Sequence, residues 1–397
     1  MDRQNVAQVI NNPVIFKNLS SDPLISSLAA VLGCCEEQTA YSKICALAGV
    51  LYESGDNLTE AVFSWLLSDE NCLIKTFAKG ETPPDGQLQW ARHELDALAQ
   101  AASVTPEMLG EMFAISQALP FWKAENRNFS DDYFAAAKNA PQNGYGVFAE
   151  SKVFTVSETG ELLPVKNPDK QRLSQLYGYE IQRRQVVDNT RALLMGLPAA
   201  NVFLYGDAGT GKSSTVKAVA NEFAHRGLRL IQVEKSCLRF IPALLDKLAD
   251  NPLSFIIFID DLSFQSEDKD FTALKTILEG SVAAKATNTV VYATGNRRHL
   301  IRESMDARRG DEVHLNDTLE ETASLSARFG MTVSFTRPDK DEFAELILSL
   351  ARQYGVTLPE SQLLSGGEAF ALRCGGRSPR AAKQYIEYKK SVGAAEI

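Results

Sequence analysis

An eight-residue stretch in the middle of the chain has the residue types and spacing that bind a polyphosphate. Residues 206–213 fit the pattern G-x-x-x-x-G-K-S/T at every fixed position. Its glycines let the backbone curl so that successive N–H groups point inward at the negative phosphates. In this pattern, Lys212 reaches the terminal phosphates and the Ser213 hydroxyl ligates Mg²⁺. We therefore expect these residues to hold a nucleotide by its phosphates: Gly206, Asp207, Ala208, Gly209, Thr210, Gly211, Lys212, Ser213 and Ser214.

The segments on either side of residues 206–213, which we call the phosphate loop, favour this interpretation over a glycine-rich surface turn. The apolar run 201–205 predicts a buried strand before the loop. A helix is predicted after it, because Val216, Val219 and Phe223 recur at helical spacing. A helix that starts at the loop adds the partial positive charge of its N-terminus to the site.

Two adjacent aspartates give the second chemical signal. Asp260 and Asp261 follow an apolar run that predicts another strand. An acid at the carboxyl end of a strand beside the phosphate-loop strand can hold Mg²⁺, usually through its waters, opposite Ser213. Asp261 then lies where a carboxylate polarises the attacking water. An ordinary strand end is the alternative, but the complete phosphate loop earlier in the chain favours the metal site.

The charge of the chain limits its partners. The 397 residues suffice for two or three domains, and their net charge of −9 is unevenly placed. Residues 1–170 hold 12 basic and 22 acidic side chains, whereas residues 171–397 hold 29 and 28. An acidic N-terminal part disfavours nucleic acid and anionic membrane surfaces as partners. The arginines between 297 and 309 alternate with acids, which favours a solvated face over a nucleic-acid patch but leaves that patch open.

The cysteines and the apolar segments bear on the compartment. The six cysteines, at 34, 35, 45, 72, 237 and 374, have no C-x-x-C spacing, so we expect idle thiols in a reducing cytosol. No apolar stretch approaches the roughly 18 residues of a membrane span, and the first residues lack a signal-peptide pattern. We therefore expect a cytoplasmic protein without a membrane partner.

The elements that must position these residues divide the chain into four predicted segments. Residues 1–150 predict a mainly helical, acidic N-terminal domain, with helices over 42–53, 58–67 and 88–101. Residues 151–170 predict a β-hairpin that links this domain to the next. Residues 171–337 alternate strands with helices, and residues 338–397 predict a helical lid with helices over about 340–354, 360–373 and 379–392.

The alternating segment predicts an α/β fold with a parallel five-stranded sheet. Short continuous apolar strands separated by helices are typical of a parallel sheet covered on both faces. The expected strands are 201–205, 228–234, 255–260, 289–294 and 331–335.

At this point the chain resembles the AAA+ ATPases, P-loop NTPases with a C-terminal helical lid, over roughly 171–393. The resemblance implies ATP and Mg²⁺ as cofactors and a homo-oligomer, either a ring or a nucleotide-dependent dimer. It implies that Asn296 matches the sensor-1 residue that contacts the attacking water or γ-phosphate. Arg328, in Ser-Ala-Arg-Phe-Gly, matches the arginine finger that acts on a neighbouring subunit's nucleotide. Arg380 matches the sensor-2 arginine of these proteins better than Arg377 does, and Arg377 is the alternative.

The resemblance to AAA+ ATPases also bears on the adenine base, and a second resemblance is to a narrower family. It implies that Tyr177, Gly178 and Tyr179 line the adenine. The phrases at 197–202, 260–264 and 296–300 also resemble a family of bacterial predicted ATP-binding proteins catalogued as a domain of unknown function. That likeness extends back to about Val153 and brings no substrate with it.

One departure from the AAA+ pattern leaves the function open between two classes. Most AAA+ proteins have Glu where this chain has Asp261, whose carboxylate is one methylene shorter. A misplacement of about 1 Å can cost about a hundredfold in rate. The first hypothesis is an ATPase that remodels a protein partner bound by the N-terminal domain. The second is a slow or non-hydrolysing binding module gated by nucleotide, and a DNA-acting loader or initiator is a weaker third.

Overall fold

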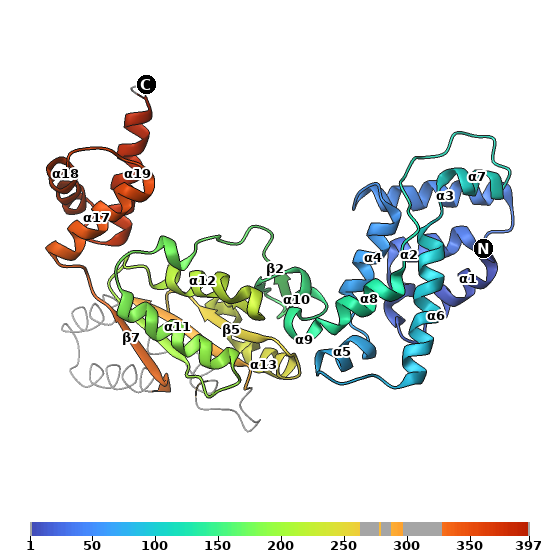
Figure 1. Ribbon diagram of the computed structural model, residues 1–397, viewed down its shortest axis with the longest axis horizontal. Coiled ribbons are helices and arrows are strands. Elements are labelled where there is room, and N and C mark those ends of the chain that lie inside the picture. Colours follow the sequence, from blue (N-terminus) through green and yellow to red (C-terminus); the bar gives the residue numbers. More distant parts are fainter. Residues whose placement is uncertain (1, 263–277, 279–286, 297–327, 396–397) are drawn as a thin grey trace, which may run out of the picture. The chain divides into compact units, whose positions relative to one another are not determined.

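The computed structural model describes residues 2–262, 278, 287–296 and 328–395 (Figure 1). The chain forms two compact units, Met1–Glu150 and Ser151–Ile397. No helix among the described residues combines the length and the apolar character that crossing a bilayer requires. All six cysteines are free thiols.

The first unit is helical. Its elements are α1 (Arg3–Asn11), η1 (Lys17–Ser21), α2 (Pro23–Leu32), α3 (Glu37–Tyr52), α4 (Leu58–Ser68), α5 (Cys72–Ala78), α6 (Asp85–Ala102), α7 (Pro106–Met112), α8 (Phe129–Lys138), α9 (Ala140–Asn143) and α10 (Val147–Glu150). The three helices predicted in this segment correspond to α3, α4 and α6. Several begin at a side-chain cap that accepts free backbone N–H groups of the first turn. The caps are Asp22 for α2, Asn57 for α4, Asn71 for α5 and Asn128 for α8.

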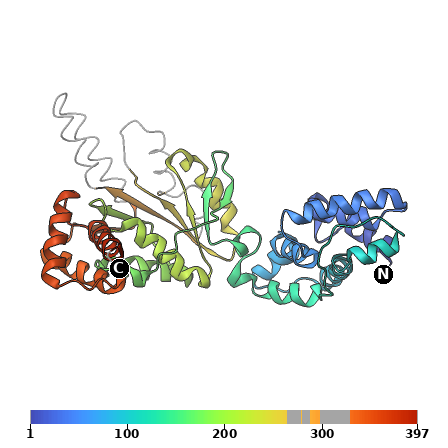
Figure 2. The ribbon, with the colours of Figure 1, turned by 90° about the horizontal axis from the view of Figure 1, so that it is seen from above.

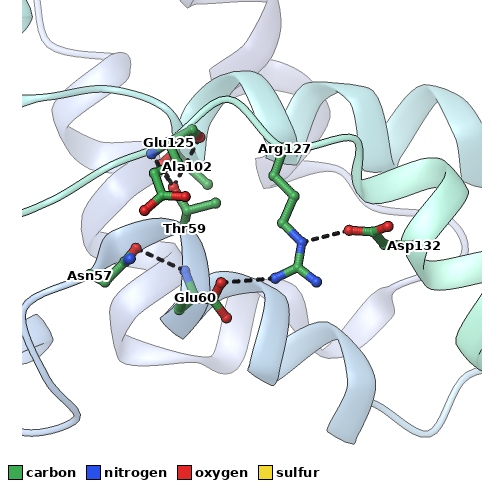
Figure 3. Close-up of polar contacts among 7 residues, drawn as sticks. All are labelled: Asn57, Thr59, Glu60, Ala102, Glu125, Arg127 and Asp132. Carbon is green, nitrogen blue, oxygen red and sulfur yellow. Dashed lines mark hydrogen bonds and ion pairs between the residues drawn. The ribbon is translucent and has the colours of Figure 1, made fainter.

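Polar contacts join the helices of this unit around its apolar core (Figure 3). The Thr59 hydroxyl in α4 donates to the carbonyl of Ala102 at 2.9 Å and accepts the amide of Glu125 at 2.8 Å. The Arg127 guanidinium donates to Glu60 in α4 and to Asp132 in α8, at 3.1 and 2.6 Å. These bonds connect the end of α6 and the segment before α8 to α4.

The second unit contains the sheet. Its elements are β1 (Val153–Val156), β2 (Leu162–Pro164), η2 (Leu173–Gln175), α11 (Glu180–Leu194), β3 (Val202–Gly206), α12 (Lys212–Phe223), η3 (Ala224–Arg226), β4 (Leu228–Gln232), η4 (Lys235–Phe240), α13 (Ile241–Ala249), β5 (Ser254–Ile259), β6 (Thr289–Asn296), β7 (Met331–Phe335), α17 (Lys340–Tyr354), α18 (Glu360–Arg373) and α19 (Pro379–Ala395). The fold is therefore α/β, and the three helices predicted after residue 338 are present as α17, α18 and α19.

The sheet is larger than predicted. Its order is β2-β1-β4-β5-β6-β3-β7, so the described residues form seven strands rather than five. The predicted hairpin belongs to it, because β1 pairs parallel with β4, with Val153 opposite Leu230, while β2 pairs antiparallel with β1. The sheet is thus mixed and not wholly parallel. The strand before Asp260 was expected beside the phosphate-loop strand, but β6 lies between β5 and β3. Phe154 and Val156 in β1 are buried, so the hairpin covers the sheet edge and is not only a linker.

Apolar packing fixes the helices around the sheet. Val186 and Leu193 in α11 share one buried cluster with Val216 and Val219 in α12 and with strand residues. The ribbon shows helices of this unit beside the strands of the sheet (Figure 2). The helices α17, α18 and α19 share a separate apolar cluster that includes Phe343. The phosphate loop joins β3 to α12, at the carboxyl ends of the parallel strands.

Candidate functional site

The backbone of the phosphate loop depends on a glycine at its first position. Gly206 ends β3 with φ of 141°, a conformation that side chains with a Cβ rarely adopt. A Cβ there would collide with the carbonyl group of Phe335 in β7. The next amide, that of Asp207, donates to this same carbonyl at 3.0 Å. The end of β7 therefore anchors the start of the loop.

Lys212 is held inside the loop. Its ammonium donates to the carbonyl oxygens of Gly206 and Asp207 at 3.2 and 2.7 Å, and the residue is only 7% exposed. Burial lowers the pKa of Lys212, the carboxylates of Asp207 and the two aspartates after β5 oppose this shift, and Arg380 adds to it. An anion entering the loop would therefore stabilise the charge of the ammonium.

Asp260 receives two hydroxyl groups on one oxygen. Ser213 at the start of α12 and Thr294 in β6 each donate to its Oδ1 at 2.6 Å. Among the described residues, nothing hydrogen-bonds to the other oxygen, Oδ2. Thr294 was not among the predicted site residues, although it is the polar residue that ends the apolar run 290–293.

The donor set fits Mg²⁺. Carboxylate and hydroxyl oxygens are the hard ligands that this ion accepts, usually with several waters and substrate phosphates. The described residues hold no cluster of three His, Cys, Asp or Glu side chains that could form a site of protein ligands alone. A Mg²⁺ ion beside Ser213 and Asp260 would therefore take its remaining ligands from phosphate and water.

Asp261 has an unusual backbone. Its φ is 53°, in the left-handed region that non-glycine residues seldom occupy. Its amide donates to the hydroxyl of Thr294 at 2.9 Å. Thr294 thus contacts both aspartates, through the side chain of one and the backbone of the other.

A cavity of about 620 Å³ brings these groups together. That volume is in the range of small-molecule and cofactor sites, roughly 300–1,000 Å³. Its lining includes Tyr177, Gly178, Tyr179, Ala208, Gly209, Thr210, Gly211, Lys212, Ser213, Ser214, Asp260, Asp261, Thr294 and Arg380. The lining also contains three residues that were not predicted from the sequence: Arg183 of α11, and Lys383 and Gln384 of α19.

The segment predicted to meet the adenine is fixed to the end of β7. The hydroxyl of Tyr179 donates to the carbonyl oxygen of Thr336 at 2.6 Å, and its ring packs on Phe335 with centroids 5.2 Å apart. Burial, followed by the nearby carboxylates of Glu342 and Asp207, raises the pKa of this phenol. Tyr179 is therefore neutral and can donate this hydrogen bond at physiological pH.

The two candidate arginines of the lid have different surroundings. Arg380, in the first turn of α19, lines the cavity, and its amide donates to the carbonyl oxygen of Gly209 at 3.2 Å. Arg377 instead donates through Nε to both oxygens of Glu368 in α18, at 2.9 and 3.1 Å. The geometry favours Arg380 as the arginine that faces a bound nucleotide.

The remaining predicted residues lie at the edge of the described ranges. The backbone of Asn296 ends β6 and pairs with Gly206, next to the phosphate loop, and its side chain is outside what the structure describes. Arg328 is half-buried, and the adjacent Phe329 stacks on Phe203 at 5.2 Å. The arginines from 297 to 309 lie outside the described residues.

Comparison with known proteins gives one family match and a set of distant structural similarities. Residues 149–392 match a family described as "Protein of unknown function (DUF815)". Among solved structures, the RuvB Holliday junction branch migration motor of Thermotoga maritima is 17% identical, with a TM-score of 0.36 over 55% of this chain and 63% of that chain. A threonine-to-valine variant of the same RuvB is 16% identical, with a TM-score of 0.37 and the same coverage. The chain spans less than two thirds of the length of these RuvB chains.

Proposed function

The chain belongs to the family of proteins of unknown function DUF815, and from this premise we propose that it is a Mg²⁺-dependent ATPase. The predicted membership of a family catalogued as a domain of unknown function is confirmed. The second unit has an AAA+ ATPase-like fold, with a phosphate loop between β3 and α12. In our proposal, ATP binding and hydrolysis drive or gate the remodelling of a protein partner.

One observation supports this proposal above the others. Lys212, Ser213, Asp260 and Asp261 follow the carboxyl ends of β3 and β5, the two strands on either side of β6, and line a cavity that also reaches Arg380. Ligands of open α/β sheets bind outside the carboxyl ends of the strands. This combination of cations, backbone amides and hard oxygen ligands suits the negatively charged phosphates of a nucleoside triphosphate and a Mg²⁺ ion.

Different residues of the chain have different roles in the proposed phosphoryl transfer to water. Lys212 exchanges its bonds to loop carbonyls for bonds to the β- and γ-phosphates. Ser213 and Asp260 would hold Mg²⁺, which would supply positive charge that offsets the negative charge developing on the phosphates. Asp261 accepts a hydrogen bond from the attacking water and Asn296 orients it. Arg380 contacts the γ-phosphate from α19.

The proposal extends to assembly and partners. Arg328 would act on the nucleotide of a neighbouring copy, so the active form would be a ring or a nucleotide-dependent dimer. The acidic first unit would bind the protein partner. Its negative charge disfavours nucleic acid there.

A nucleotide-gated binding module is the second candidate, and Asp261 favours it. A carboxylate one methylene short of the usual glutamate, on a left-handed backbone, would polarise water less effectively. ATP would then bind and order a surface while turnover stays slow.

Phosphate release by the wild-type protein and by Asp261→Asn, at saturating ATP with Mg²⁺, separates the two candidates. The ATPase proposal expects turnover in the wild type and a loss of at least about tenfold in Asp261→Asn, with ATP affinity retained, because the amide cannot act as a base. Absence of turnover in a wild-type protein that binds ATP at high protein concentration would favour the gated module.

A further inference from the structure

We propose that Thr294 is a positioning residue that holds the metal-side Asp260 and the water-side Asp261 in a fixed relation. This inference rests on the proposed function, and it adds a residue that the sequence argument did not contain. Thr294 lies near the end of β6, two residues before Asn296.

The hydroxyl of Thr294 uses both of its hydrogen-bonding capacities on the two acids. It donates its hydrogen to Oδ1 of Asp260 at 2.6 Å and accepts the amide hydrogen of Asp261 at 2.9 Å. A hydroxyl offers a single hydrogen, so the two bonds have opposite and fixed directions. Thr294 is 2% exposed, so bulk water has little access to compete for either bond.

The strands place Thr294 in this role. In the parallel register of β5 and β6, Ile259 lies opposite Ala293, so Asp260 follows directly opposite Thr294. The carbonyl oxygen of Thr294 also accepts the amide of Leu262 at 2.7 Å. Thr294 therefore contacts three successive residues after β5, including Asp261 in its left-handed conformation.

Ser213 cannot replace this contact when a metal is bound. Both hydroxyls donate to the same oxygen of Asp260. Ser213 is itself a proposed Mg²⁺ ligand, so its position depends on the ion and the phosphates. Thr294 belongs to strand β6, so its hydrogen bond holds the Asp260 carboxylate whether or not a nucleotide is bound. Partners that orient metal ligands in this way typically change metal affinity or activity by about 10- to 100-fold when removed.

Substitution of Thr294 by valine and by serine tests the proposal. Thr294→Val keeps the shape and removes the hydroxyl, whereas Thr294→Ser keeps the hydroxyl. Thr190→Val is the matched control, since Thr190 is also buried and its hydroxyl bonds to Val186 and Tyr292 at 2.8 Å, away from the cavity lining. Calorimetric titration with ADP, with Mg²⁺ and with EDTA, measures the metal-dependent tightening without turnover. Steady-state phosphate release gives kcat and KM.

We expect the ADP affinity of Thr294→Val in EDTA to be within about twofold of wild type. The gain in ADP affinity on adding Mg²⁺ should be about tenfold smaller than in the wild type. The kcat of Thr294→Val should fall about 10- to 100-fold, and its KM for ATP with Mg²⁺ should rise by up to about tenfold, in line with the weaker metal-dependent binding. Thr294→Ser should recover most of these losses. Thr190→Val should match wild type in both measurements.

Several outcomes would overturn the proposal. Wild-type Mg²⁺ tightening and kcat in Thr294→Val would remove Thr294 from this role, and equal losses in Thr190→Val would assign the effect to general loosening of the core. If the wild-type protein binds Mg²⁺ and nucleotide without hydrolysing ATP, the Mg²⁺-dependent gain in ADP affinity alone tests the role of Thr294. A wild-type protein that binds no nucleotide would instead refute the proposed function, which is a distinct result.

Discussion

At the scale of single residues, the backbone of Asp261 bears most directly on turnover. With φ of 53°, it lies in a region where aspartate is tolerated better than most residues with a Cβ, because its short polar side chain can bond locally. Its amide is held by Thr294. In the proposed ATPase, this local arrangement suits the short carboxylate of aspartate, whereas in the gated module the same carboxylate falls short of the water.

We therefore expect that Asp261→Glu does not raise the rate of ATP hydrolysis. We expect kcat to fall about tenfold or more, because the longer side chain would carry the carboxylate past the water position that we propose for Asp261. ATP affinity should stay within about threefold of wild type. Single-turnover phosphate release, with Asp261→Asn as the fully disabled reference, measures the effect. A rise in rate in Asp261→Glu would mean that the short carboxylate is what limits turnover.

At the scale of elements, local pattern predicted the strands and helices well, because each has its own apolar periodicity. The five expected strands and the helices from α17 to α19 lie where the sequence placed them. Sheet membership was harder to predict, since the pairing of β1 with β4 joins segments far apart in the chain. The same holds within the site. The pattern predicted Asp260 and Ser213, whereas Thr294 emerges only from the register of β5 and β6.

The start of α19 is the element through which the C-terminal helices would sense the nucleotide. Arg380 lines the cavity beside Gly209, while Arg377 pairs with Glu368. We expect Arg380→Ala to weaken ATP binding about tenfold while leaving ADP binding nearly unchanged, since it removes a charged partner of the γ-phosphate alone. Arg377→Ala is the matched control.

The ratio of ATP to ADP affinity, from titrations in Mg²⁺, measures this difference. Arg377→Ala should keep the wild-type ratio and lower stability slightly, because its ion pair is partly exposed. A changed ratio in Arg377→Ala with a normal ratio in Arg380→Ala would exchange the two assignments.

At the scale of the whole molecule, the two units have separate cores, so damage to one should spare the other. Glu94 is 1% exposed in the first unit and accepts the amides of Val14, Ile15 and Phe16. Glu94→Ala should destabilise that unit by about 3 kcal/mol, because the buried amides of Ile15 and Phe16 and the partly buried amide of Val14 lose their acceptor. ATP affinity should not change.

Calorimetric unfolding, followed by ATP titration of the same variant, measures both effects. Glu81→Ala, an exposed glutamate in the same unit, is the control and should shift stability by less than about 0.5 kcal/mol. A large loss of ATP affinity in Glu94→Ala would show that the first unit supports the nucleotide site directly.

The proposed function requires the phosphate loop to bind ATP, and a calorimetric titration of ATP with Mg²⁺ into wild-type and Lys212→Ala protein measures this binding. Lys217→Ala, a lysine of α12 outside the cavity lining, is the control. We predict saturable binding by the wild type and by Lys217→Ala, and a loss of at least about tenfold in Lys212→Ala, because the ammonium is a charged partner of the phosphates. Near-normal ATP affinity in Lys212→Ala, or no ATP binding by the wild type, would show that the phosphate loop is not an ATP site.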